Sequence, residues 1–130
     1  MREQPGAEDL IAGVIEFLEN DVVPATEGRL AFHTRVAARA LAIVRREIEH
    51  GLTAELEERV KLEALLGRRG TNNTLVEQLC ERIADGRIPL DSGSLQDYLW
   101  ASTLNAMAVD QPNYSAYRRT LEELNESRQT

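Results

Sequence analysis

The chain has 130 residues, of which 42% are hydrophobic and 28% charged, as is usual for one soluble globular domain. A single cysteine excludes an intramolecular disulfide, and two histidines cannot complete a structural zinc site without carboxylates. No segment approaches about 18 apolar residues, and the first residues lack the pattern of a signal peptide. We therefore expect a cytoplasmic protein with no membrane partner.

The net charge of −7 is unevenly distributed along the chain. Residues 1–27 carry seven acidic side chains and one arginine, whereas residues 28–46 carry five arginines and no acidic side chain. Nucleic acids favour domains with a net basic surface, so we expect no nucleic-acid partner. The basic segment has two interpretations: it pairs with acidic helices, or it binds a phosphate, a carboxylate or an acidic partner.

Apolar residues recur with the helical period along the first half of the chain, which predicts three helices. Residues 7–22 form an amphipathic helix that ends before Pro24. Residues 29–50 form a second helix, and Gly51 stands in the usual position after a helix C-terminus. A third helix follows over residues 53–66.

Three more helices are predicted in the second half. Thr74 begins a capping-box pattern that opens a fourth helix, and Gly86 ends this helix. Ser94 can cap a fifth helix over residues 95–111, which is apolar nearly all round. A short last helix spans about residues 114–125, and no strand is predicted.

These elements predict an all-α fold, a single-domain bundle of about six helices over residues 1–130. Residues 1–6 and 126–130 are expected to be frayed tails. The helices at residues 29–50 and 95–111 are expected at the centre of the bundle, because their apolar arcs are the widest.

The helix at residues 29–50 carries the first candidate site. His33 lies in the middle of its apolar arc with Arg29 one turn before it, while Arg35 and Arg39 line the edge of that arc. One interpretation is a core histidine that is hydrogen-bonded to a carbonyl or carboxylate. The other is a binding site, in which the arginines hold an anion and the imidazole acts as a donor or general base.

The second candidate lies near the C-terminus, where Tyr114 and Tyr117 share a helix face and Arg118 follows Tyr114 by four residues. These side chains form a stacking and hydrogen-bonding surface, or the tyrosines simply anchor a short helix. Asn113 is the expected cap of this helix.

No local motif of a hydrolase, nucleotide-binding loop or metalloprotease is found. Cys80 falls on an apolar helix face, so we expect it in the core. The sequence therefore favours a protein that is not an enzyme, and we assign no catalytic residue, metal or cofactor.

Residues 28–41 (GRLAFHTRVAARAL) and 113–119 (NYSAYRR) resemble a family of small, all-helical bacterial proteins classed as a domain of unknown function. The resemblance extends loosely over essentially the whole chain. It implies a gene neighbourhood with aminoglycoside-phosphotransferase-like kinases and acyl-CoA dehydrogenases. It implies no catalytic residue, because the family has no established activity.

Two hypotheses follow. The first is a non-catalytic accessory protein, expected to be a homo-oligomer, that binds such a kinase or acyl-CoA dehydrogenase. The alternative is a binder or enzyme for an anionic small molecule such as an acyl-CoA. In that case the arginines at positions 29, 35 and 39 hold the phosphate or carboxylate, and His33 and Tyr114 contact the recognised group.

Overall fold

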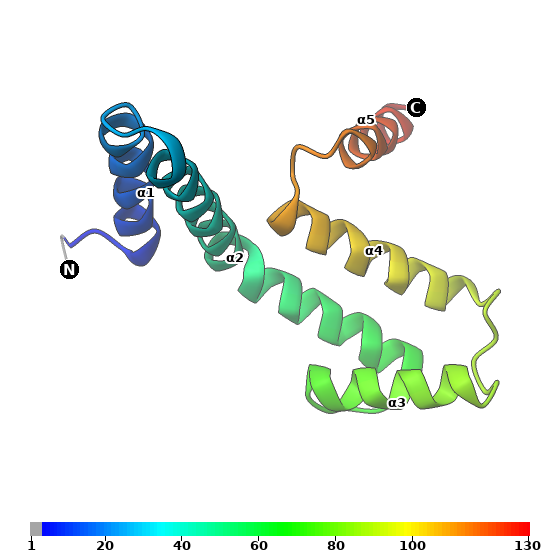
Figure 1. Ribbon diagram of the computed structural model, residues 1–130. Coiled ribbons are helices and arrows are strands. Elements are labelled where there is room, and N and C mark those ends of the chain that lie inside the picture. The colour runs from blue at the N-terminus through cyan, green and yellow to red at the C-terminus, as the bar shows by residue number, and fades with distance from the viewer. Residues whose placement is uncertain (1–3) are drawn as a thin grey trace. The chain divides into compact units, whose positions relative to one another are not determined.

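The computed structural model describes residues 4–130, and in these residues it has five α-helices and no strand. The elements in chain order are α1 (Ala7–Phe17), a π-helical turn η1 (Leu18–Val22), α2 (Gly28–Leu66), α3 (Asn72–Ala84), α4 (Gly93–Asp110) and α5 (Ser115–Gln129) (Figure 1). The prediction of an all-helical fold is confirmed, whereas the number of helices differs from the expected six.

The difference arises in α2, which joins the two helices expected at residues 29–50 and 53–66. Gly51 is helical and does not have a positive φ, so it does not end the helix. One interior glycine costs about 1 kcal/mol relative to alanine, and the Leu- and Glu-rich residues after it favour continued helix. The helix ends instead at Gly67, which has a φ of 67°.

Two helices begin earlier than expected because a neighbouring hydroxyl residue provides the cap. Thr71, not Thr74, caps α3, and its Oγ1 accepts the backbone N–H of Thr74 at 3.3 Å. Ser92, not Ser94, caps α4 and accepts the N–H of the third residue after it at 3.4 Å. The predicted end of α3 is confirmed, since Gly86 follows it with a φ of 78°.

The last helix also differs at both ends. Tyr114 occupies the N-cap position of α5, whereas Asn113, the expected cap, instead accepts a hydrogen bond from Arg118 through its Oδ1 at 2.7 Å. The helix continues to Gln129, beyond the expected end near residue 125. Fraying of residues 126–130 stays a prediction, and the expected N-terminal tail lies partly outside the described residues.

The chain divides into two compact units, of which unit 1 ends at Gly51 and unit 2 spans Leu52–Thr130. Each unit is described by itself. The expected single-domain bundle stays a prediction.

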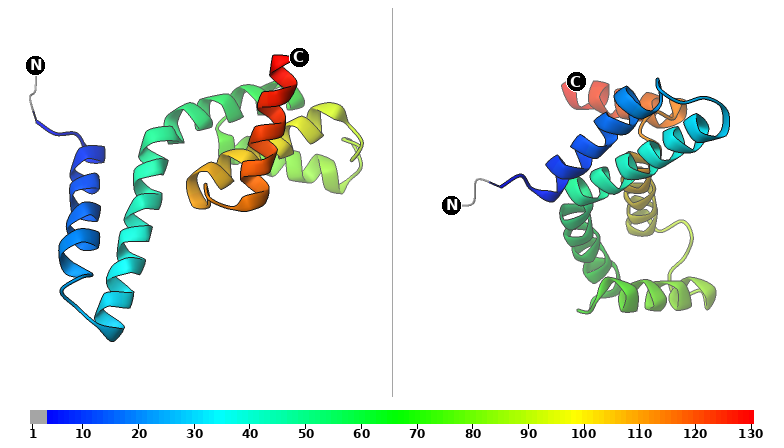
Figure 2. Two further views of the ribbon diagram at one scale, coloured as in Figure 1. Left: turned by 90° about the horizontal axis from the view of Figure 1, so that it is seen from above. Right: turned by 60° about the vertical axis from the view of Figure 1, so that its left-hand side comes forward.

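Unit 1 is a helical hairpin in which α1 and the first part of α2 lie side by side in opposite directions (Figure 1, Figure 2). Its buried residues are Ala31, Thr34 and Ala38, all on α2. Thr34 Oγ1 satisfies its hydrogen-bonding capacity by donating to the carbonyl of Leu30 at 2.7 Å. Small side chains allow the helices to approach closely but bury little apolar area.

Unit 2 has a larger core, to which three helices contribute. Its buried residues are Leu62 and Leu66 of α2, Leu75 and Leu79 of α3, and Leu95 and Tyr98 of α4. Cys80 is exposed, which corrects its predicted place in the core. The inward face of α3 runs through Leu75 and Leu79, and the next residue points about 100° away from it.

The continuity of α2 can be tested at two glycines. Gly51→Ala is expected to raise the free energy of unfolding by about 0.5–1 kcal/mol, because a Cβ there meets only Glu47 Cγ at 3.8 Å. Gly67→Ala is the matched control and should lower the free energy of unfolding. Nothing lies within 4 Å of the added Cβ, but the positive φ of Gly67 disfavours any side chain. Urea denaturation measures both changes, and a loss of stability in Gly51→Ala would contradict a continuous helix.

Candidate functional site

The side chains of Arg35 and Arg39 share an open cavity of about 250 Å³ in unit 1 with Glu19 and Val23. The spacing of four on α2 places both guanidinium groups on one side of the helix, as the sequence predicts. Within the described part of the chain, neither makes a hydrogen bond or ion pair. Both charges are therefore available to an anion, although the nearby Glu19 carboxylate weakens the attraction.

Arg29 and His33 form a contact of their own on the surface of α2. Arg29 Nε donates a hydrogen bond to His33 Nε2 at 3.3 Å, and the Phe32 ring lies edge-on to the imidazole with 5.4 Å between ring centroids. Both side chains are exposed, so the interpretation of His33 as a core histidine is wrong. An accepting Nε2 carries no proton, so this contact requires the neutral ring.

The C-terminal candidates belong to unit 2. Tyr114 is exposed, and Tyr117 is half-buried. The Arg118 guanidinium donates to the carbonyl of Pro112 at 3.4 Å and to Asn113 Oδ1 at 2.7 Å. Arg118 thus holds the turn that precedes α5, and its polar contacts are local.

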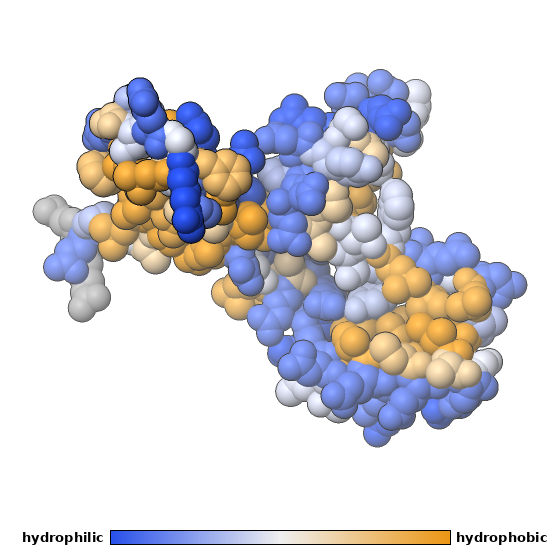
Figure 3. All heavy atoms as spheres, in the orientation of Figure 1, coloured by the Kyte–Doolittle hydropathy of each residue, from blue (hydrophilic) through white to orange (hydrophobic). Residues whose placement is uncertain are grey.

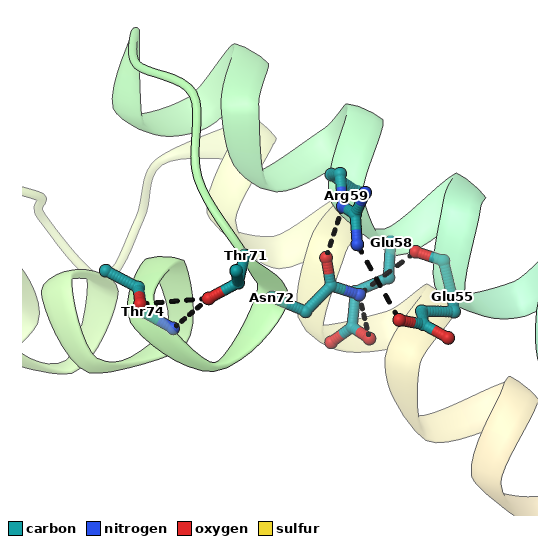
Figure 4. A network of polar contacts seen from close by, with 6 residues as sticks. All are labelled: Glu55, Glu58, Arg59, Thr71, Asn72 and Thr74. Carbon is teal, nitrogen blue, oxygen red and sulfur yellow. Dashed lines mark hydrogen bonds and ion pairs between the residues drawn. The ribbon is translucent and has the colours of Figure 1, made fainter.

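A polar network that the sequence analysis missed joins α3 to α2 at the side chain of Asn72 (Figure 4). Asn72 Nδ2 donates to the carbonyl of Glu55 at 3.0 Å and to Glu58 Oε2 at 3.4 Å, while its Oδ1 accepts from Arg59 Nε at 3.1 Å. Arg59 also pairs with the Glu55 carboxylate at 3.6 Å. The side-chain amide of Asn72 therefore uses both its N–H donors and its oxygen acceptor to fix α3 against α2.

The same network reaches α4 through Tyr98, whose hydroxyl donates to Glu58 Oε1 at 2.8 Å. Burial raises the pKa of Tyr98 well above its ordinary value of 10.0, and the hydrogen bond to Glu58 raises it further. Forty residues separate the two partners, so no local spacing could reveal the pair. These groups satisfy one another and serve the packing of three helices.

Unit 2 also presents an apolar stripe on α2, formed by Leu52, Leu56 and Val60 at a spacing of four. Their exposed fractions are 70%, 52% and 67%. Leu56 and Val60, together with Glu57 and Lys61, line an open cavity of about 360 Å³. Exposed apolar side chains that adjoin in this way mark surfaces where another protein binds.

In residues 4–130, no three His, Cys, Asp or Glu side chains lie together as metal ligands would. Across the same residues, no helix has the length and apolar character needed to cross a membrane.

A family described as "Domain of unknown function (DUF6285)" matches residues 24–114. The chain belongs to this family. The matched segment contains α2, α3 and α4 with Arg29, His33, Arg35, Arg39 and Tyr114, and it ends before Tyr117 and Arg118. None of the curated proteins and none of the solved structures compared with the chain matches it.

The Tyr98–Glu58 hydrogen bond predicts a pH-dependent stability. Tyr98→Phe should cost about 1 kcal/mol at pH 7. Because the pKa of Tyr98 is higher in the folded protein than in the unfolded chain, the contribution of the neutral phenol is complete below pH 10 and is lost as the pH rises further.

The difference in free energy of unfolding between wild type and Tyr98→Phe should therefore stay constant below about pH 10 and narrow above it, measured by urea denaturation. Tyr114→Phe, at an exposed tyrosine of the same unit, is the control and should leave stability at pH 7 unchanged. A difference that stays constant with pH would contradict the buried hydrogen bond.

Proposed function

We propose that the protein is a non-catalytic, cytoplasmic interaction protein that serves a phosphotransferase-like kinase or an acyl-CoA dehydrogenase. The observation that carries this proposal is the apolar stripe of unit 2. Its three large aliphatic side chains are more than half exposed on a helix whose neighbouring face, about 100° away, is fixed by the buried Leu62 and Leu66.

A stripe of this kind suits a partner helix. Residues four apart form the ridges that pack into the grooves of another helix. Glu57 and Lys61 flank the stripe and provide a polar rim, as at most protein interfaces. Because Leu62 and Leu66 pack α2 against α3 and α4, the stripe is presented without the entropy loss of ordering a flexible segment.

The choice of partner rests on the resemblance to the family, which implies a gene neighbourhood with kinases and dehydrogenases of these two classes. An accessory protein needs no reacting groups of its own, only a surface that one enzyme recognises. This accords with a polar network in unit 2 whose members are bonded to one another.

The proposal is tested by titrating the purified protein into a phosphotransferase-like kinase and into an acyl-CoA dehydrogenase of the same organism, with calorimetry as the readout. Binding is expected to one of them, and Leu56→Glu should weaken it about 30-fold or more, because a carboxylate is then buried against apolar surface. Leu90→Glu, at an exposed leucine outside the stripe, is the control and should bind like wild type. Binding to neither enzyme, or an unaffected Leu56→Glu variant, would refute the proposal.

A second candidate function is the binding of an anionic small molecule such as an acyl-CoA. The observation in its favour is the cavity where two guanidinium groups without ion pairs face one space. Arginine binds phosphate and carboxylate through paired hydrogen bonds, so Arg35 and Arg39 suit a phosphate of that ligand. Whether such a binder would also be an enzyme depends on His33, which lies on the same helix but is not among the residues that line the cavity.

A thermal-shift screen of CoA, acetyl-CoA and inorganic phosphate tests this function. A ligand at one hundred times its dissociation constant should add about 2.7 kcal/mol of stability. Arg35→Ala combined with Arg39→Ala should abolish the shift, and Glu19→Gln should increase it because a repelling carboxylate is removed. Arg119→Ala in unit 2 is the control. No shift with any of the three compounds would exclude this function.

A further inference from the structure

The hairpin of unit 1 has an apolar face that its own two helices leave uncovered. We call it the hairpin face and define it by six side chains, each between 42% and 60% exposed. They are Leu10, Val14 and Phe17 of α1, and Leu30, Val44 and Ile48 of α2. Hydrophobic side chains cover much of the surface of unit 1 that Figure 3 shows.

These six residues lie on one side of the hairpin. At about 100° per residue, the three on α1 fall within about 60° of one another and the three on α2 within about 40°. On each helix, these three residues lie about 90° around the helix axis from the residues that face the other helix. The direction of this rotation is the same on both helices. Since α1 and the first part of α2 are antiparallel, equal displacements bring both groups to the same side.

Three charged side chains lie on the other side. Glu19 on η1 and Arg35 and Arg39 on α2 are displaced by a similar angle in the opposite sense. Their shared cavity shows that these displacements do converge on one side. The hairpin is therefore apolar on one broad side, and its other side carries these three charges next to the exposed Phe32.

A hairpin built in this way needs a second layer. Stable domains have at least two packed layers, and chains of about 50 residues are marginal even when they are compact. The residues that unit 1 buries between its helices, Ala31, Thr34 and Ala38, are small. Large aliphatic side chains such as Ile11, Ile15 and Ile43 are buried only in part, so covering the hairpin face adds to the apolar burial that keeps this unit folded.

We infer that the hairpin face binds the same face of a second copy, so that two hairpins related by a two-fold axis form a four-helix bundle. A two-fold axis brings identical surfaces together, and four antiparallel-paired helices around one apolar core are a common stable arrangement. The inference goes beyond the proposed function, because it concerns unit 1 and holds whether or not unit 2 binds an enzyme.

The apolar area agrees with what a stable dimer requires. A large apolar side chain that is half exposed offers on the order of 100 Å², so six on each copy bury about 1,200 Å² in the pair. Specific protein interfaces bury roughly 1,200–2,000 Å² in total, and backbone and smaller side chains such as Ala37 add to the six. The charged side stays in water, so the cavity of Arg35 and Arg39 remains open in the dimer.

The oligomeric state of the full chain tests the inference, measured by sedimentation equilibrium over a range of concentrations. Wild type should have twice the chain mass of 14.6 kDa. Phe17→Glu should raise the dissociation constant of the dimer about 100-fold or more, because each copy then buries a charge against apolar surface. Phe32→Glu is the matched control, since Phe32 is 60% exposed on α2 but points away from the hairpin face, and it should stay dimeric.

Val14→Lys repeats the test at a second position and with the opposite charge. Circular dichroism checks that each variant is still helical, so that a single misfolded variant does not decide the result. A monomeric wild type would overturn the inference. A dimer that persists in both hairpin-face variants would also overturn it. A dimer that Leu56→Glu dissociates would overturn it too, because self-association would then occur through the apolar stripe of unit 2. Loss of enzyme binding with an intact dimer would refute only the proposed function.

Discussion

The continuity of α2 through Gly51 is the constraint on which both units depend. The residues before this glycine bury Ala31 and Ala38 in unit 1, and the residues after it bury Leu62 and Leu66 in unit 2. A break at Gly51 would separate the hairpin from the helix that carries most of the polar network. The cost of a glycine inside a helix is about 1 kcal/mol, and it is offset because a break would leave four carbonyls without partners.

The two units differ in how their apolar residues are used. Unit 2 buries large side chains from three helices and closes this core with hydrogen bonds from Asn72 and Tyr98 to Glu58. Unit 1 fully buries only small residues, buries large ones such as Ile11, Ile15 and Ile43 in part, and leaves six large ones exposed on the hairpin face. A unit with a complete core can present a rigid stripe to a different protein, whereas a unit without one needs a second layer to be stable. This difference separates the two proposed interfaces.

Local sequence patterns correctly predicted features that depend on neighbouring residues, such as the end of a helix. They did not predict features that depend on residues far apart in the chain, such as the burial of a side chain. Gly86 was correctly placed after α3, because its positive φ follows from the chain's own turn. The helical period alone could not place His33 or Cys80, since a wide apolar arc does not reveal which part faces the core. The spacing of Arg35 and Arg39 predicted their shared side, but their cavity also needs Glu19 from another helix.

The wide apolar arc of α2 carries more information than a central position in a bundle. A single helix neighbour covers only one line of contact, and in unit 1 that line is occupied by Ala31, Thr34 and Ala38. Apolar side chains beyond that line, such as Leu30 and Ile48, remain about half exposed. An apolar arc that is wider than one line of contact therefore indicates that a further element packs on the helix. The sequence shows how wide the arc is, but it does not show whether that element belongs to the same chain or to another one.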